Sequence, residues 1–245
     1  MKGDTEVVVM IILFFAGAFF AAFAEDVSLL PFINTLIAPL ATLVAAFFGA
    51  KYAFKLQAQQ KQEETYRTEV EAGNKVIFQL IRLHNKFGAI REQFIEKYRD
   101  NSGRHYLIQP IAGLDIKDPH INYDSLSFIF NSGELNILTE LSSFEQEIAS
   151  AIEVISRRSD HHYRIIQPAV EQLEKEHGKE ITLEKIDSIL GKREAQIAKM
   201  STDNMIMCVD SIMHYDKLII KLSNLMKGLY KGHTIISMSI HDSPN

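Results

Sequence analysis

The chain has 245 residues, 47% of them hydrophobic, and carries a formal net charge of −5 at pH 7. This length allows one or two domains, and the mildly acidic balance gives no reason to expect strong nonspecific binding to nucleic acids. The single cysteine, Cys208, excludes an intramolecular disulfide framework and fits a reducing compartment.

Two apolar stretches without a charged residue lie near the N-terminus, at 7–24 and 29–50. As helices they would be roughly 27 and 33 Å long, which matches a hydrocarbon core about 30 Å thick. The short acidic connection between them, residues 25–28, permits only an antiparallel arrangement. We therefore expect residues 1–50 to form a hairpin of two transmembrane helices.

The charges that flank these stretches predict their orientation. Lys51, Lys55 and Lys61 follow the second stretch before any acidic residue, whereas the connection holds Glu25 and Asp26. The positive-inside rule then places both termini in the cytoplasm and the connection outside. The expected product is a multi-pass protein of a cell's inner membrane.

An alternative is that the first stretch is a signal peptide. Residues 22–24, Ala-Phe-Ala, resemble a signal-peptidase site. However, the leading MKGDTE is not basic, and the 18 residues of 7–24 are more than a usual signal core. We favour a retained hairpin.

Small residues recur at a spacing of four in both stretches. Such faces let helix backbones approach closely in lipid, where packing drives association, either within one hairpin or between copies in a homo-oligomer. In the second stretch, Pro39 predicts a kink, and Asn34 requires either a partner helix or a water-filled pore. The predicted packing positions are Gly17, Ala21, Ala41, Ala45 and Gly49.

Residues 51–245 hold all but one of the 26 Lys and Arg residues and predict a cytoplasmic helical domain, with a polar membrane-proximal stalk at 51–69. Apolar residues at spacings of three, four and seven indicate long amphipathic helices. These stripes cover 70–98, 135–155 and 205–229. The expected fold is therefore mainly α, with an antiparallel bundle of long helices after the hairpin.

Local signals divide this domain further. Pro168 predicts that the second long helix kinks or restarts after Gln167, and Thr182 predicts the N-cap of a short helix that Gly191 ends. Short strands are expected at 106–108 and 234–240.

The densest polar cluster is RRSDHHYR at 157–164. On a helix, Arg157, His161 and Arg164 share one face, and with Arg158 they form a candidate site for an anionic partner such as a phosphate. The same residues equally fit the solvated back of the second long helix, because the apolar stripe ends at Ile155. Both interpretations remain open.

No pattern indicates a catalytic or metal site. The histidines at 161 and 162 point about 100° apart, and no HExxH, CxxC, P-loop, GxGxxG or GxSxG sequence occurs. We therefore predict no enzyme, no metal, no cofactor and no small-molecule substrate.

The short start, the tight hairpin, the exit FFGAKYAFKLQ and the stretch DSLSFIFNSGELNILTELSSFEQEI at 124–148 together resemble a family of bacterial two-transmembrane-helix proteins, the retron-associated effectors of anti-phage defence. The resemblance is architectural, covers the whole length loosely and carries over no functional residue. It implies a toxin that a complex of reverse transcriptase, DNA and RNA holds silent. Release on phage infection would damage the bacterial inner membrane and kill the cell.

We therefore expect a membrane-anchored effector whose hairpins associate to permeabilise the inner membrane. Its expected partners are the lipid bilayer, further copies of itself and a regulatory protein–nucleic-acid complex. The alternative is a membrane-anchored helical scaffold or signalling adaptor whose hairpin is only an anchor. A third possibility is a membrane enzyme with an unrecognised site.

Overall fold

The computed structural model describes residues 29–111, 120–178 and 182–238, together with Phe14, Ala16, Gly17 and Phe20, and it describes the side chains of α2 from Pro39 onward. The chain divides into two compact units, Met1–Glu64 and Thr65–Asn245. The division falls inside the predicted stalk.

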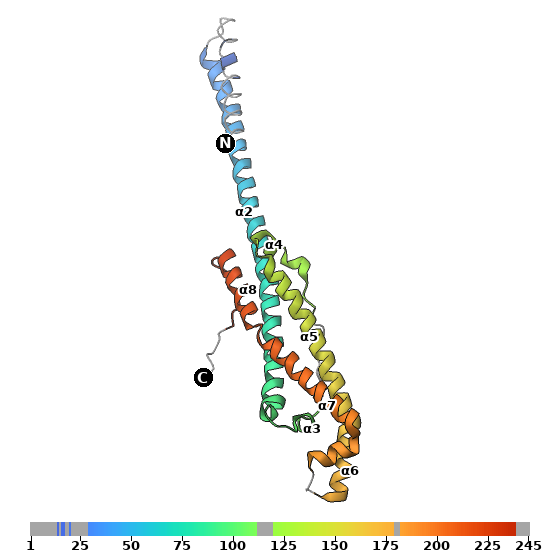
Figure 1. Ribbon diagram of the computed structural model, residues 1–245. Helices are drawn as coiled ribbons and strands as arrows, with labels where there is room; N and C mark the ends of the chain where they lie inside the picture. The colour runs from blue at the N-terminus through green and yellow to red at the C-terminus, as the bar shows by residue number, and fades with distance from the viewer. Residues whose placement is uncertain are drawn as a thin grey trace. The chain divides into compact units, whose positions relative to one another are not determined.

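The described secondary structure is helical, which confirms the predicted mainly α class (Figure 1). The longer helices are α2 (Leu29–Ile90), α5 (Leu135–His161), α6 (Gln167–His177), α7 (Leu183–Met213) and α8 (Asp216–Leu229). The short ones are η1 (Arg91–Ile95), η2 (Glu96–Tyr98), α3 (Arg104–Leu107), η3 (Tyr123–Leu126), α4 (Ser127–Ser132) and η4 (His162–Ile166). Of these, η1 and η4 are single π-helical turns, and η2 and η3 are 3₁₀ turns.

In the first unit, α2 runs through the whole of 29–50 and continues past Pro39 without ending. Large apolar side chains on this part of α2 are exposed, and the rings of Phe47 and Phe48 pack edge to face at 5.7 Å. Among the residues whose side chains are described, no helix is both long and apolar enough to cross a membrane. The exposed apolar residues are Leu43, Phe48, Tyr52, Phe54 and Leu56.

The rest of the predicted hairpin lies largely outside the described residues. Of the first predicted span, 7–24, the structure describes Phe14, Ala16, Gly17 and Phe20, all exposed, and it does not describe the connection at 25–28. The transmembrane hairpin therefore stays a prediction.

The second unit has a helical core to which residues 65–90 of α2 contribute one face. The spacing of that face was predicted, and its residues Val70, Ile77, Leu80 and Phe87 are buried. Gly73 lies between them, and a Cβ there would collide with the side chain of Met226 in α8. The missing side chain thus lets α2 and α8 approach closely.

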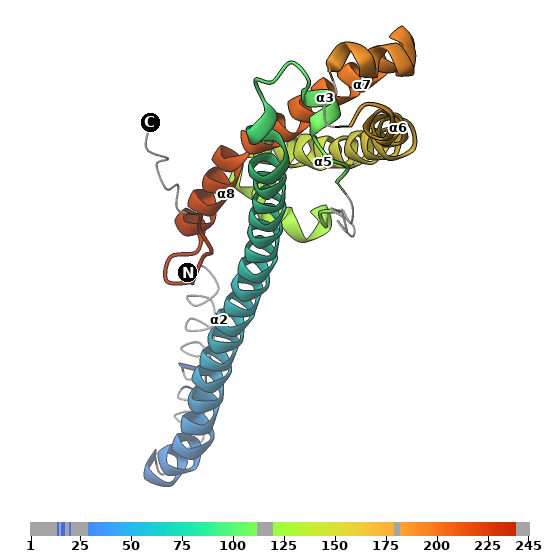
Figure 2. The same ribbon diagram turned by 90° about the horizontal axis from the view of Figure 1, so that it is seen from below.

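Helices α5 and α7 pack against each other, and both figures show them together (Figures 1 and 2). Their polar contacts establish that they are antiparallel. His161 near the end of α5 meets Glu194 near the start of α7, at 3.0 Å between Nε2 and Oε2. Glu147, earlier in α5, accepts a hydrogen bond of 2.5 Å from Ser211 near the end of α7. The antiparallel packing that the stripes predicted is present here.

The prediction of one helix over 205–229 is wrong, because α7 ends at Met213 and α8 begins at Asp216. Tyr215, in the turn between them, packs edge to face on Phe144 at 4.9 Å and donates a hydrogen bond of 2.7 Å to Glu147. These tertiary contacts stabilise the turn. The apolar spacing carries no sign of it, because Ile212 and Ile219 stand seven residues apart and keep the stripe in phase.

Two other boundaries follow their predicted signals. Helix α6 restarts with Pro168 in its first turn, where a missing backbone N–H costs nothing. Helix α7 is kinked at Gly191, and this kink ends the short helix that begins after Thr182. The φ of Gly191 is 77°, a value that only glycine adopts readily. A small second core joins α3, α6 and α7 and consists of Tyr106, Ile166, Leu173, Ile186 and Ala198.

The predicted strand at 106–108 is wrong, because Tyr106 and Leu107 belong to the one-turn helix α3. Residues 234–238, the described part of the second predicted strand, form no strand either. Both segments are short, and alternation over so few residues does not separate a strand from a turn.

Phe144→Ala should lower the free energy of unfolding by about 3–5 kcal/mol, because this 1% exposed ring would leave a cavity in the core. The exposed neighbour Gln146 is the matched control, and Gln146→Ala should change stability by less than about 0.5 kcal/mol. Chemical denaturation of the full chain measures both. Equal losses in the two variants would contradict the burial described here.

Candidate functional site

Arg158 lies on α5 and points into the contact between α3, α5 and α7, where its side chain is 2% exposed. Its Nη1 donates to the carbonyl oxygen of Gln109 at 2.9 Å, and its Nη2 donates to the carbonyl oxygens of Ile108 and His105. Its Nε lies 3.4 Å from the hydroxyl of Thr202 on α7. The guanidinium thus holds the C-terminal end of α3 through backbone carbonyls.

All these acceptors are neutral. Within the described residues, no carboxylate pairs with Arg158, so carbonyl and hydroxyl dipoles alone stabilise a charge removed from water. Burial lowers the pKa of Arg158 to about 10, because desolvation disfavours the charged form. The group still carries its charge at neutral pH.

Ser159 on α5 and His162, the first residue of η4, extend this contact. The Ser159 hydroxyl accepts a hydrogen bond of 3.0 Å from the backbone N–H of Ile111. The His162 ring, 3% exposed, binds the carbonyl oxygen of Tyr106 through Nε2 at 3.1 Å. We call Arg158, Ser159 and His162 the α5 triplet, since the three together bind the backbone of residues 105–111.

Burial lowers the pKa of His162 to about 4, although its bond to the Tyr106 carbonyl acts in the opposite direction. His162 is therefore neutral near pH 7, with its proton on Nε2 and its buried Nδ1 without a hydrogen-bond partner. On the other side of the segment, the Tyr106 hydroxyl donates to Asp187 of α7. Burial, and then this bond, raise the pKa of Tyr106.

The structure does not bring the four predicted anion-binding residues together on one surface. Arg158 is buried, and this corrects the expectation that it faces a partner. Arg157 is 79% exposed and pairs with Glu153, whereas His161 pairs with Glu194 of α7. Arg164 is exposed in the π turn η4.

The helical face that joined Arg157, His161 and Arg164 assumed a regular α-helix. The π turn at His162–Ile166 holds more residues in a turn and shifts Arg164 away from that face.

Sequence reasoning also missed Ser159 and His162. A signal existed, because positions 158, 159 and 162 continue the buried stripe of Ile155 at helical spacing, with polar residues in place of apolar ones.

Glu145, which precedes Arg158 on α5 by about three and a half turns, binds the segment that begins at His120. Its carboxylate lies 2.8 Å from His120 Nδ1 and accepts hydrogen bonds from the Tyr123 hydroxyl at 2.9 Å and the Ile121 N–H at 3.4 Å. α5 therefore fixes residues 120–123 here, and residues 105–111 through the α5 triplet.

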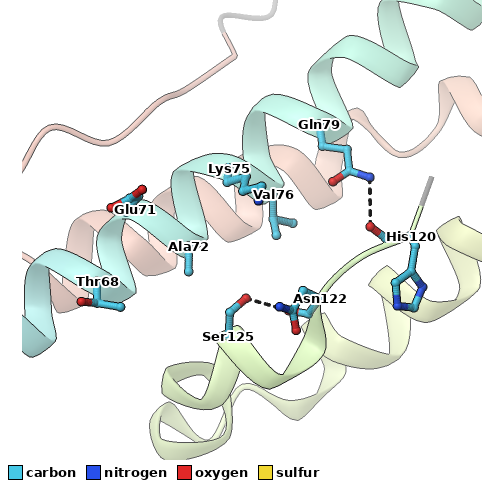
Figure 3. Close-up of a pocket in the computed structure, with 9 residues that line it drawn as sticks. All are labelled: Thr68, Glu71, Ala72, Lys75, Val76, Gln79, His120, Asn122 and Ser125. Atoms are coloured by element: carbon cyan, nitrogen blue, oxygen red, sulfur yellow. Dashed lines mark hydrogen bonds between the residues drawn. The ribbon is translucent and has the colours of Figure 1, made fainter. Parts of the chain in front are cut away.

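A surface hollow of about 320 Å³ lies between α2 and this segment (Figure 3). Ala72 and Val76 form an apolar floor, and the Gln79 amide donates a hydrogen bond of 3.3 Å to the carbonyl oxygen of His120. Exposed Glu71 and Lys75 lie at its edge, with no buried polar group aimed into it. We assign the hollow no ligand.

The predicted membrane-packing residues lie mostly on exposed positions of the first unit. Ala41, Ala45 and Gly49 are exposed on α2, and Gly17 is exposed and helical. Ala21 and the Asn34 side chain lie outside the described residues. Pro39 is exposed within α2.

In the described part of the chain, no group of three or more His, Cys, Asp or Glu side chains is placed to hold a metal ion. Cys208 is partly buried, and burial raises the pKa of its thiol, which disfavours the reactive thiolate.

No protein-family model matches the chain, and no curated protein or solved structure is significantly similar to it.

The stability of the second unit should fall as the pH drops from about 6.5 to about 4, partly because of His162. Its folded-state pKa lies below the unfolded value, so the unfolded chain binds more protons in this window, and acid favours unfolding. His162→Gln keeps an N–H donor for the Tyr106 carbonyl but cannot titrate. Denaturation at several pH values should give a weaker pH dependence for the variant, and parallel curves would contradict the buried neutral imidazole.

Proposed function

We propose that this chain is a membrane-anchored effector that permeabilises the bacterial inner membrane, with residues 1–50 as a hairpin of two transmembrane helices and both termini in the cytoplasm. The proposal rests first on the sequence. The stretches 7–24 and 29–50 contain no charged residue and are separated by a connection of four residues. Two such stretches match the thickness of a bilayer.

The exposed apolar side chains of the first unit support the same proposal. Leu43 and Phe48 are more than half exposed on α2, and a helix with apolar residues on its surface requires lipid or protein around it. Tyr52 and Phe54 follow, 70% and 71% exposed, interleaved with Lys51 and Lys55. Aromatic and basic residues at the end of an apolar stretch are typical of the cytoplasmic membrane interface.

Permeabilisation requires that hairpins associate, and the small-residue face of α2 supplies a surface for this. Ala41, Ala45 and Gly49 are exposed, and a Cβ built on Gly49 would meet no atom within 4 Å. Close backbone approach is the main source of helix association in lipid. The same face could instead pack against the other helix of its own hairpin. This is the arrangement expected for the alternative, an anchored scaffold without pore activity.

The regulatory partner is proposed from the resemblance to retron-associated effectors: a protein–nucleic-acid complex that holds the second unit silent until phage infection. A soluble partner controls such a device by binding the silent and the active arrangements with different affinity. Release would then let hairpins pack between copies instead of within one.

A reporter fused after Asn245 should read as cytoplasmic, and one inserted at Val27 as external. The lysines after the second stretch and the acidic connection predict this orientation. Paired reporters that are active on opposite sides of the membrane measure it. The opposite readout contradicts the topology, and a mature N-terminus at Glu25 would identify the first stretch as a signal peptide.

Overexpressed without a regulator, the chain should collapse the membrane potential, and Ala45→Leu should remove this effect at unchanged abundance in the membrane. The larger side chain separates helix backbones without adding charge, so insertion survives and association fails. A potential-sensitive dye measures the effect.

Ala46→Leu is the matched control, since it makes the same change about 100° around the helix, off the small-residue face. This control should retain the activity. If the unmodified chain leaves membrane potential and growth untouched, the effector proposal fails and the anchored scaffold takes its place. Equal loss in both variants would contradict the packing face.

A further inference from the structure

The Arg158 guanidinium makes weaker bonds than its chemistry allows. A hydrogen bond with one ionised partner is already roughly twice as strong as a neutral one, and an acceptor of opposite charge adds direct electrostatic attraction. The planar fork of arginine also fits an oxyanion through two parallel N–H donors. Here the fork binds the carbonyl oxygens of Gln109 and Ile108, which carry only partial negative charge. These oxygens occupy the place that an oxyanion would fill.

Two further groups converge on the same segment. The Ser159 hydroxyl accepts a hydrogen bond from the Ile111 N–H, and His162 donates its Nε2–H to the Tyr106 carbonyl oxygen. Arg158 on α5 and His162, the first residue of η4, stand four residues apart, and the His162 backbone N–H bonds the Arg158 carbonyl oxygen, so the two lie on one helical face. The buried α5 triplet thus offers a guanidinium, a hydroxyl and an imidazole to one small region.

We propose that residues 104–111 form a removable latch over an oxyanion-binding site made by Arg158, Ser159 and His162, and that a phosphate or carboxylate group competes with the latch for it. This site is independent of the proposed membrane activity. It differs from the exposed cationic face expected from the sequence, because its donors become available only when the latch leaves.

The latch is held by its contacts and not by its own secondary structure. Helix α3 is a single turn, which is too short to be stable in isolation. Its apolar anchors are Tyr106, Ile108 and Ile111. The proposal requires these anchors to leave the core while the rest of the domain stays folded, which is a local opening.

Acidic residues of α7 oppose the opening. Asp187 accepts a hydrogen bond from Tyr106, and Asp203 pairs with Arg104 at 2.7 Å. An anion must therefore outcompete these contacts, together with the apolar anchors, before the site forms. This threshold separates the proposed site from a basic surface that binds any anion weakly.

Hydrogen–deuterium exchange of the full chain tests the proposal, with inorganic phosphate as the probe and sodium chloride at matched ionic strength as the reference. The amides of Tyr106, Ile108 and Ile111 report on the latch because each is hydrogen-bonded when it is closed. We expect phosphate to accelerate their exchange severalfold. In general, phosphate slows exchange, because it is excluded from protein surfaces and thereby stabilises the folded state.

Arg158→Met should speed exchange of the latch in both salts and abolish the difference between them. The exposed neighbour gives the matched control, because Arg157→Met removes the same charge and should keep the response of the unmodified chain. Repeating the experiment with acetate separates a carboxylate ligand from a phosphate ligand. Equal exchange of the unmodified chain in chloride, phosphate and acetate would overturn the proposal, whether or not Arg158→Met folds, and so would loss of the response in Arg157→Met.

Discussion

The burial of the Arg158 charge is the constraint on which the contact between α3, α5 and α7 depends. A guanidinium removed from water must be surrounded by acceptors, or its desolvation destabilises the fold by several kcal/mol. The nearest acceptors are carbonyls at the end of α3, and they converge on the guanidinium only when the chain leaves α2, turns through η1 and η2 and lays residues 104–109 against α5. This charge on the facing helix therefore helps to fix the position of the connection, together with the buried side chains of Tyr106, Ile108 and Ile111.

The same helix supplies several other polar contacts that join distant segments. Glu145 binds residues 120–123, and Glu147 binds Ser211 and Tyr215. Four contacts between distant segments, two of them on α5, have one chemical form, a tyrosine hydroxyl that donates to a carboxylate: Tyr106 to Asp187, Tyr123 to Glu145, Tyr215 to Glu147 and Tyr230 to Glu69. In each case, burial and the carboxylate raise the tyrosine pKa. A neutral donor on a charged acceptor joins two elements without burying a second charge, and such bonds contribute about 1.5–3 kcal/mol each.

Sequence periodicity predicted the helices of the second unit and most of its core, because burial on one helical face leaves a direct pattern. Leu141, Phe144 and Ile148 are buried as that pattern requires. It failed where the buried residue is polar. Arg158, Ser159 and His162 continue the stripe, yet they look like the start of a solvated surface. Their burial is favourable because backbone carbonyls and one backbone N–H of a segment some 50 residues earlier bind them. No local pattern reports a partner so distant in the chain. No sequence signal indicates the π turn after His161 either.

The two units differ in the groups that lack a favourable environment: exposed apolar side chains in the first, and a buried charge in the second. On the described part of the first unit, large apolar side chains from Leu43 to Leu56 are exposed, so the medium or chain that covers them must come from outside that segment. In the second unit many apolar side chains form a core, although Phe78, Phe130 and Met207 are exposed there too. This unit also holds a buried charge bound by neutral oxygens. Lipid or a second helix would stabilise the exposed apolar surface, whereas an anion would stabilise a buried cation that lacks a counter-charge. The exposed apolar side chains of the first unit carry the proposed membrane activity, and the neutral acceptors of Arg158 carry the proposed anion site, so each proposal rests on a different unit of the chain.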